Sequence, residues 1–284
     1  MTSSSSAPIL FDRALLAARQ RRVAGAPETF LMERVVEDMA DRLLAVNRRF
    51  TAVADIWTPG GLRAPFVEGF ANFTALAAPD TAREELGLAP NSLDLALSAL
   101  AFQFVNDLPG VLAQIRRALR PDGLLLAAMI GGDSLIELRQ SFAAAEAECE
   151  GGVSPRVAPF ADLRDIGSLL QRAGFALPVT DVDRVVVRYR NAFGLMQDLR
   201  RMGATNSLIE RRRTPTRRTT LLRMAEIYAE RFADPDGRIR ATFDIIWISG
   251  WAPHESQQTP LKPGSAKASL EDAVKRAQSA RDDM

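Results

Sequence analysis

The sequence predicts an α/β fold in which a mostly parallel sheet carries helices on both faces. Short apolar runs alternate with segments whose apolar residues recur at helical spacing, which is typical of such sheets. One run, Leu124–Ile130, is apolar throughout, as expected for a strand covered on both faces. No apolar run approaches the roughly 18 residues that a membrane-spanning helix needs, so we expect no transmembrane segment.

The first half of the chain alternates strongly between the two kinds of segment. Helices are predicted at residues 29–47, 108–119 and 134–148, and strands at residues 52–56, 93–98 and 124–130. Val35 and Met39 belong to the apolar side of the first helix, and Arg48 and Arg49 suit its C-terminal end. Arg120–Gly123 predicts a turn, because its proline presets φ and its glycine tolerates a positive φ.

The second half continues the alternation. Helices are predicted at residues 160–173, 193–202 and 219–232, and strands at residues 181–189 and 241–251. Gly174 follows the first of these helices, where glycine commonly ends a helix. The very basic segment Arg211–Arg218 favours a solvated arginine face, with docking of an acidic partner as the alternative. In such a sheet, ligands bind at the carboxyl ends of the strands.

Length and composition favour one large domain. The chain has 284 residues, of which 47% are hydrophobic and 25% charged, with a net charge of +1. We expect an N-terminal arm at residues 1–28, a domain at 29–260 with a helical insertion at 190–237, and a mobile C-terminal tail at 261–284. The Arg-rich stretch at 11–22 raises a transit peptide as an alternative, which Asp12 disfavours.

Two counts exclude much chemistry. Cys149 is the only cysteine, so the chain forms no intrachain disulfide and no CxxC motif, and a reducing compartment suits it. His254 is the only histidine, which excludes a zincin helix and a two-histidine iron triad within one chain. No metal site is predicted, and the balanced charge indicates no nucleic-acid partner.

Several motifs resemble a known family. Ser98–Pro109 and Leu119–Gly123 are similar to the region around the fourth and fifth strands of class I S-adenosylmethionine (SAM) dependent methyltransferases. More specific stretches are Phe11–Arg13, Gly131–Arg139, Glu150–Pro155, Met202–Asn206 and Gly250–Gln257. Together they resemble the complex I assembly factor 5 family, the mitochondrial arginine hydroxylases, and its bacterial methyltransferase-like relatives. The resemblance implies a Rossmann-like class I methyltransferase sheet with a helical insertion before the last strand.

The cofactor loop departs from the Asp-x-Gly-x-Gly-x-Gly pattern of these enzymes. Trp57 and Pro59 occupy two glycine positions, and only Gly61 matches. Between Asp55 and Asn91 lie 36 residues. Two helices, two strands and their loops need about 45–50 residues, so one element is predicted to be shortened or missing.

The resemblance implies binding of SAM, and the candidate cofactor-binding residues are Asp55, Gly60, Gly61, Asp80 and Ser98. Asp55 ends a strand at the ligand edge, with a helix cap as the alternative. Gly60 and Gly61 equally suit a plain turn. The family places an acid at the end of its second strand, where Glu68 is a guess, and another after its third, which Asp80 matches.

The candidate catalytic residues are Asp107, Asp133 and His254. Asn106 and Asp107 follow the strand after which related enzymes contact the nucleophile, and Asp133 follows Gly131 and Gly132 after the next strand. Helix capping is the alternative for both aspartates. His254 lies in the family-like stretch His-Glu-Ser-Gln, although a lone histidine is more often structural.

Three functions stay open. The leading hypothesis is a SAM-dependent methyltransferase-like protein that acts on a protein substrate and is linked to respiratory complex I assembly. The second is hydroxylation of an arginine in a complex I subunit. The third is a non-catalytic assembly factor, which Trp57 and Pro59 favour because they disrupt the cofactor loop. The expected location is the bacterial cytoplasm, or the mitochondrial matrix if the chain is eukaryotic.

Overall fold

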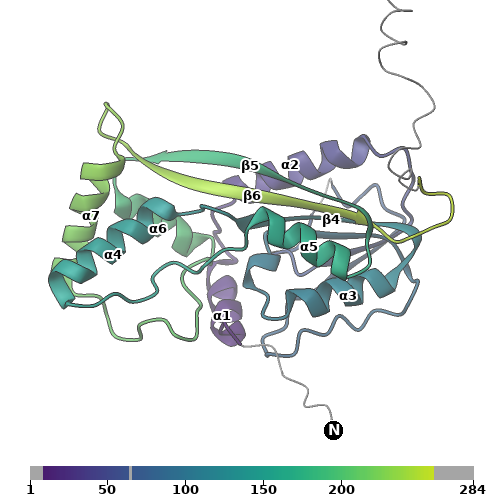
Figure 1. Ribbon diagram of the computed structural model, residues 1–284, viewed down its shortest axis with the longest axis horizontal. Helices are drawn as coiled ribbons and strands as arrows, with labels where there is room; N and C mark the ends of the chain where they lie inside the picture. Colours follow the sequence, from purple (N-terminus) through teal and green to yellow (C-terminus); the bar gives the residue numbers. More distant parts are fainter. Residues whose placement is uncertain (1–8, 64–65, 259–284) are drawn as a thin grey trace, which may run out of the picture. The chain divides into compact units, whose positions relative to one another are not determined.

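The computed structural model describes residues 9–63 and 66–258 of the chain (Figure 1). The predicted tail at 261–284 and the start of the predicted arm lie outside these residues. The chain divides into two units, Met1–Pro253 and His254–Met284. The fold and the cavity described below belong to the first unit.

The first unit is built on a six-stranded sheet in the order β2-β1-β3-β4-β6-β5. The strands are β1 (Ala52–Ile56), β2 (Asn72–Leu76), β3 (Leu93–Ala99), β4 (Leu119–Gly131), β5 (Ala176–Tyr189) and β6 (Ile239–Trp251). The pairs from β2 to β4 are parallel, whereas β6 runs antiparallel to both β4 and β5. The predicted α/β class is confirmed.

Helices cover both faces of this sheet (Figure 1). They are α1 (Arg13–Val23), α2 (Phe30–Leu44), α3 (Leu108–Ala118), α4 (Ile136–Glu150), α5 (Leu163–Arg172), α6 (Ala192–Arg201) and α7 (Arg218–Phe232). Side chains alternate between the two faces of a strand. Accordingly Ala96 of β3 packs with the core beneath α3 and α5, while its neighbours Leu95 and Leu97 pack with Val35 and Met39 of α2.

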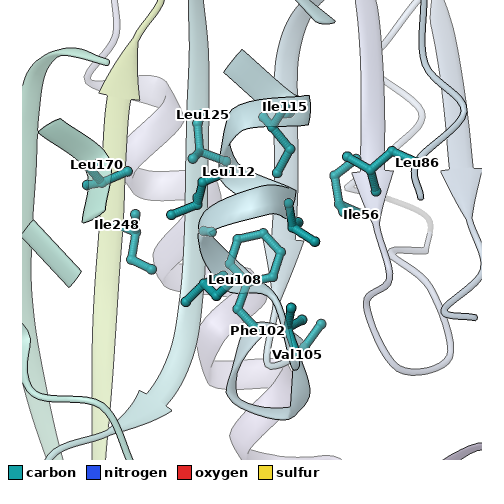
Figure 2. Close-up of a cluster of buried hydrophobic side chains, with 14 of the residues drawn as sticks. Ile56, Leu86, Phe102, Val105, Leu108, Leu112, Ile115, Leu125, Leu170 and Ile248 are labelled. Atoms are coloured by element: carbon teal, nitrogen blue, oxygen red, sulfur yellow. The ribbon is translucent and has the colours of Figure 1, made fainter. Parts of the chain in front are cut away.

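The core beneath α3 shows why this helix forms where the sequence predicts it. Its buried residues recur at helical spacing: Leu108, Val111, Leu112, Ile115 and Ala118. Figure 2 shows Leu108, Leu112 and Ile115 within this core. The Asp107 carboxylate caps its first turn by accepting a hydrogen bond from the Gly110 N–H at 2.9 Å. The helical spacing and the N-cap indicate the same start for the helix. The predicted helix, residues 108–119, ends one residue later than the observed one.

The predicted turn at Arg120–Gly123 lies inside β4. Asp122 has φ 61°, as a turn requires, but the Asp122 N–H donates to the Ala252 carbonyl and the Ala252 N–H donates to the Gly123 carbonyl. These bonds keep the irregular stretch in the sheet. The register with β3 correspondingly skips, from Leu93 opposite Leu119 to Leu95 opposite Leu124. The strand therefore begins earlier than residue 124.

The segment between β1 and β3 is more reduced than the sequence predicts. Its described residues form β2 and no helix, although the family pattern calls for helices on either side of a second strand. Glu68 precedes β2, and Asp80 follows β2 rather than a third strand. The guess that Glu68 ends the second strand is wrong, because Leu76 ends it.

The helical insertion before the last strand consists of α6 and α7, which lie between β5 and β6 in the chain. With α4 they enclose a second core that includes Phe142, Leu195, Met224 and Tyr228. These helices lie beside the long strands β5 and β6 (Figure 1). Residues of α6 and α7 line the cavity described next.

Candidate functional site

The candidate site is a cavity of about 1390 Å³ at the carboxyl ends of the parallel strands. The chain leaves β1 toward β2 and leaves β3 toward β4, so β1 and β3 flank the point where the strand order reverses. Open α/β sheets bind ligands at this point. The loop residues Pro59–Leu62 after β1 and the residues Leu100, Gln103 and Phe104 after β3 line the cavity.

Gly60 and Gly61 are the predicted site residues that reach this cavity. Both have positive φ, 77° and 71°, and the Gly61 N–H closes a turn on the Thr58 carbonyl at 2.8 Å. Glycine adopts such angles without the cost that a Cβ adds. The two glycines therefore form a turn and also line the cavity, so the turn that the sequence offered as an alternative is compatible with a place in the cavity wall.

Asp55 lies behind this turn and positions it. Its side chain is 1% exposed, and Oδ2 accepts a hydrogen bond from the Leu62 N–H at 2.9 Å. Within the described chain, no hydrogen bond reaches the buried Oδ1. Burial raises the pKa of the Asp55 carboxyl, and hydrogen bonds from Thr58 and Leu62 oppose that rise in part. The carboxyl group is therefore buried directly behind a loop that lines the cavity.

Trp57 does not block the cavity. Its side chain is 3% exposed and belongs to the core cluster that also contains Ile56 and Phe102. Among the described residues that line the cavity, Trp57 is absent, while Pro59 is present. Trp57 nevertheless has φ 64°, a conformation that is costly for a residue with a Cβ. Trp57 thus stands at a position where the family pattern has glycine, and its indole packs in the core instead of entering the cavity.

The start of α1 closes the strand ends beside Trp57. The Arg13 guanidinium lies over the indole, 5.6 Å from the ring centroid, and donates to the carbonyls of Pro79 at 3.3 Å and Phe104 at 3.0 Å. Its Nε is 3.7 Å from a carboxylate oxygen of Glu84. Arg13 therefore ties the loop after β2 to the loop after β3.

Glu84 and Asn106 complete this connection. The Glu84 carboxylate accepts the N–H groups of Asn106 at 2.9 Å and Asp107 at 2.7 Å, and Asn106 Oδ1 accepts those of Leu10 and Phe11 at 2.8 Å. Sequence reasoning missed the roles of Arg13 and Glu84. The only available signal was the family-like stretch Phe11–Arg13, because Glu84 stands in the segment with the weakest resemblance.

The remaining aspartate candidates lie away from the cavity walls. Asp107 caps α3, and Asp133 forms an ion pair with Arg184 at 3.1 Å on the exposed side of β5. Asp80 is exposed and is not among the described lining residues. The structure thus shows the capping role that was the alternative prediction for Asp107. Asp133 pairs with Arg184 and is not among the described residues that line the cavity.

Ser98 is also separate from this cavity's walls, and His254 belongs to the second unit. The Ser98 hydroxyl donates to the Ile56 carbonyl at 2.8 Å and joins β3 to β1, so this buried group has a structural role. His254 begins the second unit, where its Nδ1 lies 2.7 Å from the Ser256 hydroxyl. Among residues 9–63 and 66–258, no group of three or more His, Cys, Asp or Glu side chains is arranged to hold a metal ion.

Part of the basic segment lines the cavity instead of forming only a solvated face. Arg211, Arg212 and Arg213 all belong to the wall. Arg211 pairs with Asp12 at 3.1 Å, and Arg212 pairs with Glu150. No described helix is long and apolar enough to span a bilayer.

Comparison with known proteins adds the following similarities. Residues 74–127 match the family described as Methyltransferase domain. The human protein "Arginine-hydroxylase NDUFAF5, mitochondrial" is 36% identical over 92% of this chain and 82% of its own length. The Dictyostelium discoideum protein of that name is 46% identical over 64% of this chain, and the match covers 42% of its length. A malonyl-[acyl-carrier protein] O-methyltransferase of Laribacter hongkongensis is 39% identical over 69% of this chain and 62% of its own length.

Proposed function

The chain belongs to the family of the mitochondrial arginine-hydroxylase NDUFAF5, and from this premise we propose that it is a SAM-dependent methyltransferase-type enzyme. Its substrate would be a protein in the assembly of respiratory complex I. The observation that carries the proposal is the cavity at the switch point between β1 and β3, lined by the Gly60–Gly61 turn. We place the protein in the bacterial cytoplasm, or in the matrix if it is mitochondrial as its named relatives are.

The residues at the end of β1 fit the amino-acid end of SAM. The buried Asp55 Oδ1 is an acceptor without a hydrogen bond. Asp55 is not a wall residue, so the ammonium group of SAM would have to reach it past the Gly60–Gly61 turn, and it would then satisfy Oδ1 as a donor. A Cβ built on Gly61 would lie 3.9 Å from Asp55 Oδ2, an ordinary contact, so it is the positive φ of 71° rather than lack of space that favours glycine here. The family pattern has an acid at the end of the second strand, which would bind the ribose. Among the described residues, no acid that follows β2 lines the cavity, so the ribose would be held by other groups.

When bound, SAM would supply a methyl group to an in-line nucleophile, with the carbon–sulfur bond breaking, S-adenosylhomocysteine leaving and the nucleophile losing a proton to solvent. The chain contributes mainly position, which is worth up to about 7–11 kcal/mol in ideal cases. Asp55 fixes the Gly60–Gly61 turn through the Leu62 N–H, and this turn sets the depth at which a ligand rests. Leu100, Phe104 and Ile130 form an apolar wall that excludes water from the reacting groups.

Arginine hydroxylation is the second candidate, and a specific observation favours it. Relatives named arginine-hydroxylase match nearly the whole chain, whereas the methyltransferase family matches residues 74–127. The two candidates differ in the product, because methylation adds a CH₂ unit and hydroxylation adds one oxygen atom. Hydroxylation would also need molecular oxygen and an added metal or flavin, since the described residues contain no group that could hold a metal ion. Both use the same cavity, so the products distinguish them better than binding does.

The test is mass spectrometry of complex I subunits from cells that lack the gene. The subunits are incubated with the purified chain and methyl-labelled SAM, in parallel with the Asp55→Asn variant and a matched Asp165→Asn control on the exposed face of α5. We expect labelled methyl groups with the wild type and Asp165→Asn, and a marked loss with Asp55→Asn. Unlabelled oxygenated arginine would instead support hydroxylation, and an unmodified subunit whose assembly still depends on the chain would support a non-catalytic assembly factor.

A further inference from the structure

The cavity extends well beyond the strand ends into the helical half of the first unit. Apolar side chains of α2, α4 and α6 line this part: Leu31, Val36, Leu138, Phe142, Met196 and Leu199. Pockets for single drug-sized ligands measure about 300–1000 Å³, so 1390 Å³ leaves room for a second ligand beside a cofactor. The helical half is therefore an apolar compartment that the proposed function does not use.

Arginine is the most frequent charged residue in the walls of this cavity. Eight arginines and three glutamates line it, with no aspartate or lysine among the described lining residues. Three of these arginines, Arg156, Arg211 and Arg212, pair with acids that lie outside the wall. Arg200 and Arg213 are exposed, and their side chains make no hydrogen bond or ion pair with the described residues. Arg19 donates only to the carbonyls of Thr205 and Asn206, at 2.8 and 2.7 Å. Burial lowers the pKa of Arg19, the charge of Arg211 lowers it further, and the charge of Asp12 opposes this effect.

We propose that the helical half of the cavity binds an anionic amphiphile, an aliphatic chain with a carboxylate head. The chain would pack against the apolar residues of α4 and α6, and the carboxylate would pair with Arg200 and Arg213. Arginine binds carboxylates with two parallel hydrogen bonds, which suits this head group. This binding site is independent of SAM binding.

An aliphatic chain suits the compartment better than a peptide does. A peptide carries backbone N–H and C=O groups, which are costly to bury without partners. The walls formed by α4 and α6 present apolar side chains, and the backbone groups in the middle of these helices are already paired. An amphiphile needs polar partners only at its head, where the arginines lie.

Calorimetry of the full chain with three amphiphiles tests the proposal. We expect saturable binding of dodecanoate, weaker binding of decanoate by roughly fourfold for each methylene removed, and no binding of dodecylamine. The shorter chain buries less apolar surface, and the amine is repelled by the arginines. Absence of saturable dodecanoate binding, or equal binding of dodecylamine, would overturn the proposal.

Variants locate the site. The double variant Arg200→Gln/Arg213→Gln should weaken dodecanoate binding at least tenfold, while Arg172→Gln, an exposed arginine of α5 outside the cavity wall, should leave it unchanged. Met196→Trp should weaken it by filling the compartment. Equal effects of the double variant and of Arg172→Gln would contradict a site at Arg200 and Arg213. The titrations with dodecanoate, decanoate and dodecylamine use the unmodified protein, so they test the proposal even if a variant fails to fold.

Two further measurements distinguish this site from the SAM site and from a surface that binds membranes or peptides. Asp55→Asn should weaken SAM binding and leave dodecanoate binding unchanged, so failure of one proposal does not imply failure of the other. Vesicles of phosphatidylglycerol and phosphatidylcholine, and an acidic apolar peptide, are tested alongside free dodecanoate. Binding to either of them without binding of free dodecanoate would overturn the inference.

Discussion

The two sides of the switch point are held together by different forces. On one side, β3, β4 and β6 are covered by α3 and α5, and the core consists of apolar side chains such as Leu112 and Ile166. On the other, the described chain between β1 and β3 has no helix, and polar groups such as Glu84 tie loops to the backbone. The side formed by β1 and β2 therefore depends on the segment at the start of α1, rather than on helices of its own, to anchor its loops.

The largest effect should come from the apolar side. Leu112→Ala in α3 removes a fully buried side chain and should lower the free energy of unfolding by about 2–5 kcal/mol. The matched change Leu76→Ala at the end of β2 should cost less than half as much, because Leu76 is only partly buried. Urea unfolding measures both. Equal losses would mean that the two sides are packed alike.

Glu84→Ala should give the next largest effect, on the polar side. It leaves the N–H groups of Asn106 and Asp107 without acceptors, which should cost about 2–4 kcal/mol of unfolding free energy. Its exposed neighbour Glu85 provides the control, and Glu85→Ala should change stability by less than about 0.5 kcal/mol. Similar urea midpoints for the two variants would refute the anchoring role of Glu84.

Asp94 should make stability depend on pH in a defined window. Burial alone would raise its pKa, but hydrogen bonds from Thr51, Ala52 and Arg120 lower it to about 2. A lowered pKa stabilises the fold above the unfolded value near 4, and this contribution disappears as pH falls through about 2. Asp94→Asn should therefore cost about 2 kcal/mol at pH 7 and little at pH 2. A cost independent of pH would contradict this.

The smallest effect concerns the backbone at Trp57. Trp57→Ala and Trp57→Gly both remove the buried indole, but glycine tolerates the positive φ of 64°. Trp57→Gly should therefore be more stable than Trp57→Ala by about 1 kcal/mol, measured by urea unfolding. If Trp57→Ala is the more stable variant, the positive φ at residue 57 does not destabilise the folded protein.

The sequence predicts the apolar side of the switch point better than the side held by polar contacts. The region from β3 to α3 is defined by local signals, namely an apolar run, an N-cap at Asp107 and helical spacing, and the structure follows them. Gly60 and Gly61 were found because a positive φ favours glycine. The roles of Arg13 and Glu84 depend on contacts between residues about 70 positions apart, which local patterns do not encode. Asp133 was misplaced because its partner Arg184 lies on β5, far along the chain.

The central claim is that the cavity between the ends of β1 and β3 still binds SAM despite Trp57 and Pro59. Isothermal calorimetry of the full chain with SAM tests it most directly. We predict saturable binding with one site per chain and a dissociation constant below about 1 mM, weakened roughly tenfold or more by Asp55→Asn and unchanged by Asp165→Asn. No heat of binding at millimolar SAM would contradict the claim and leave the cavity to other ligands.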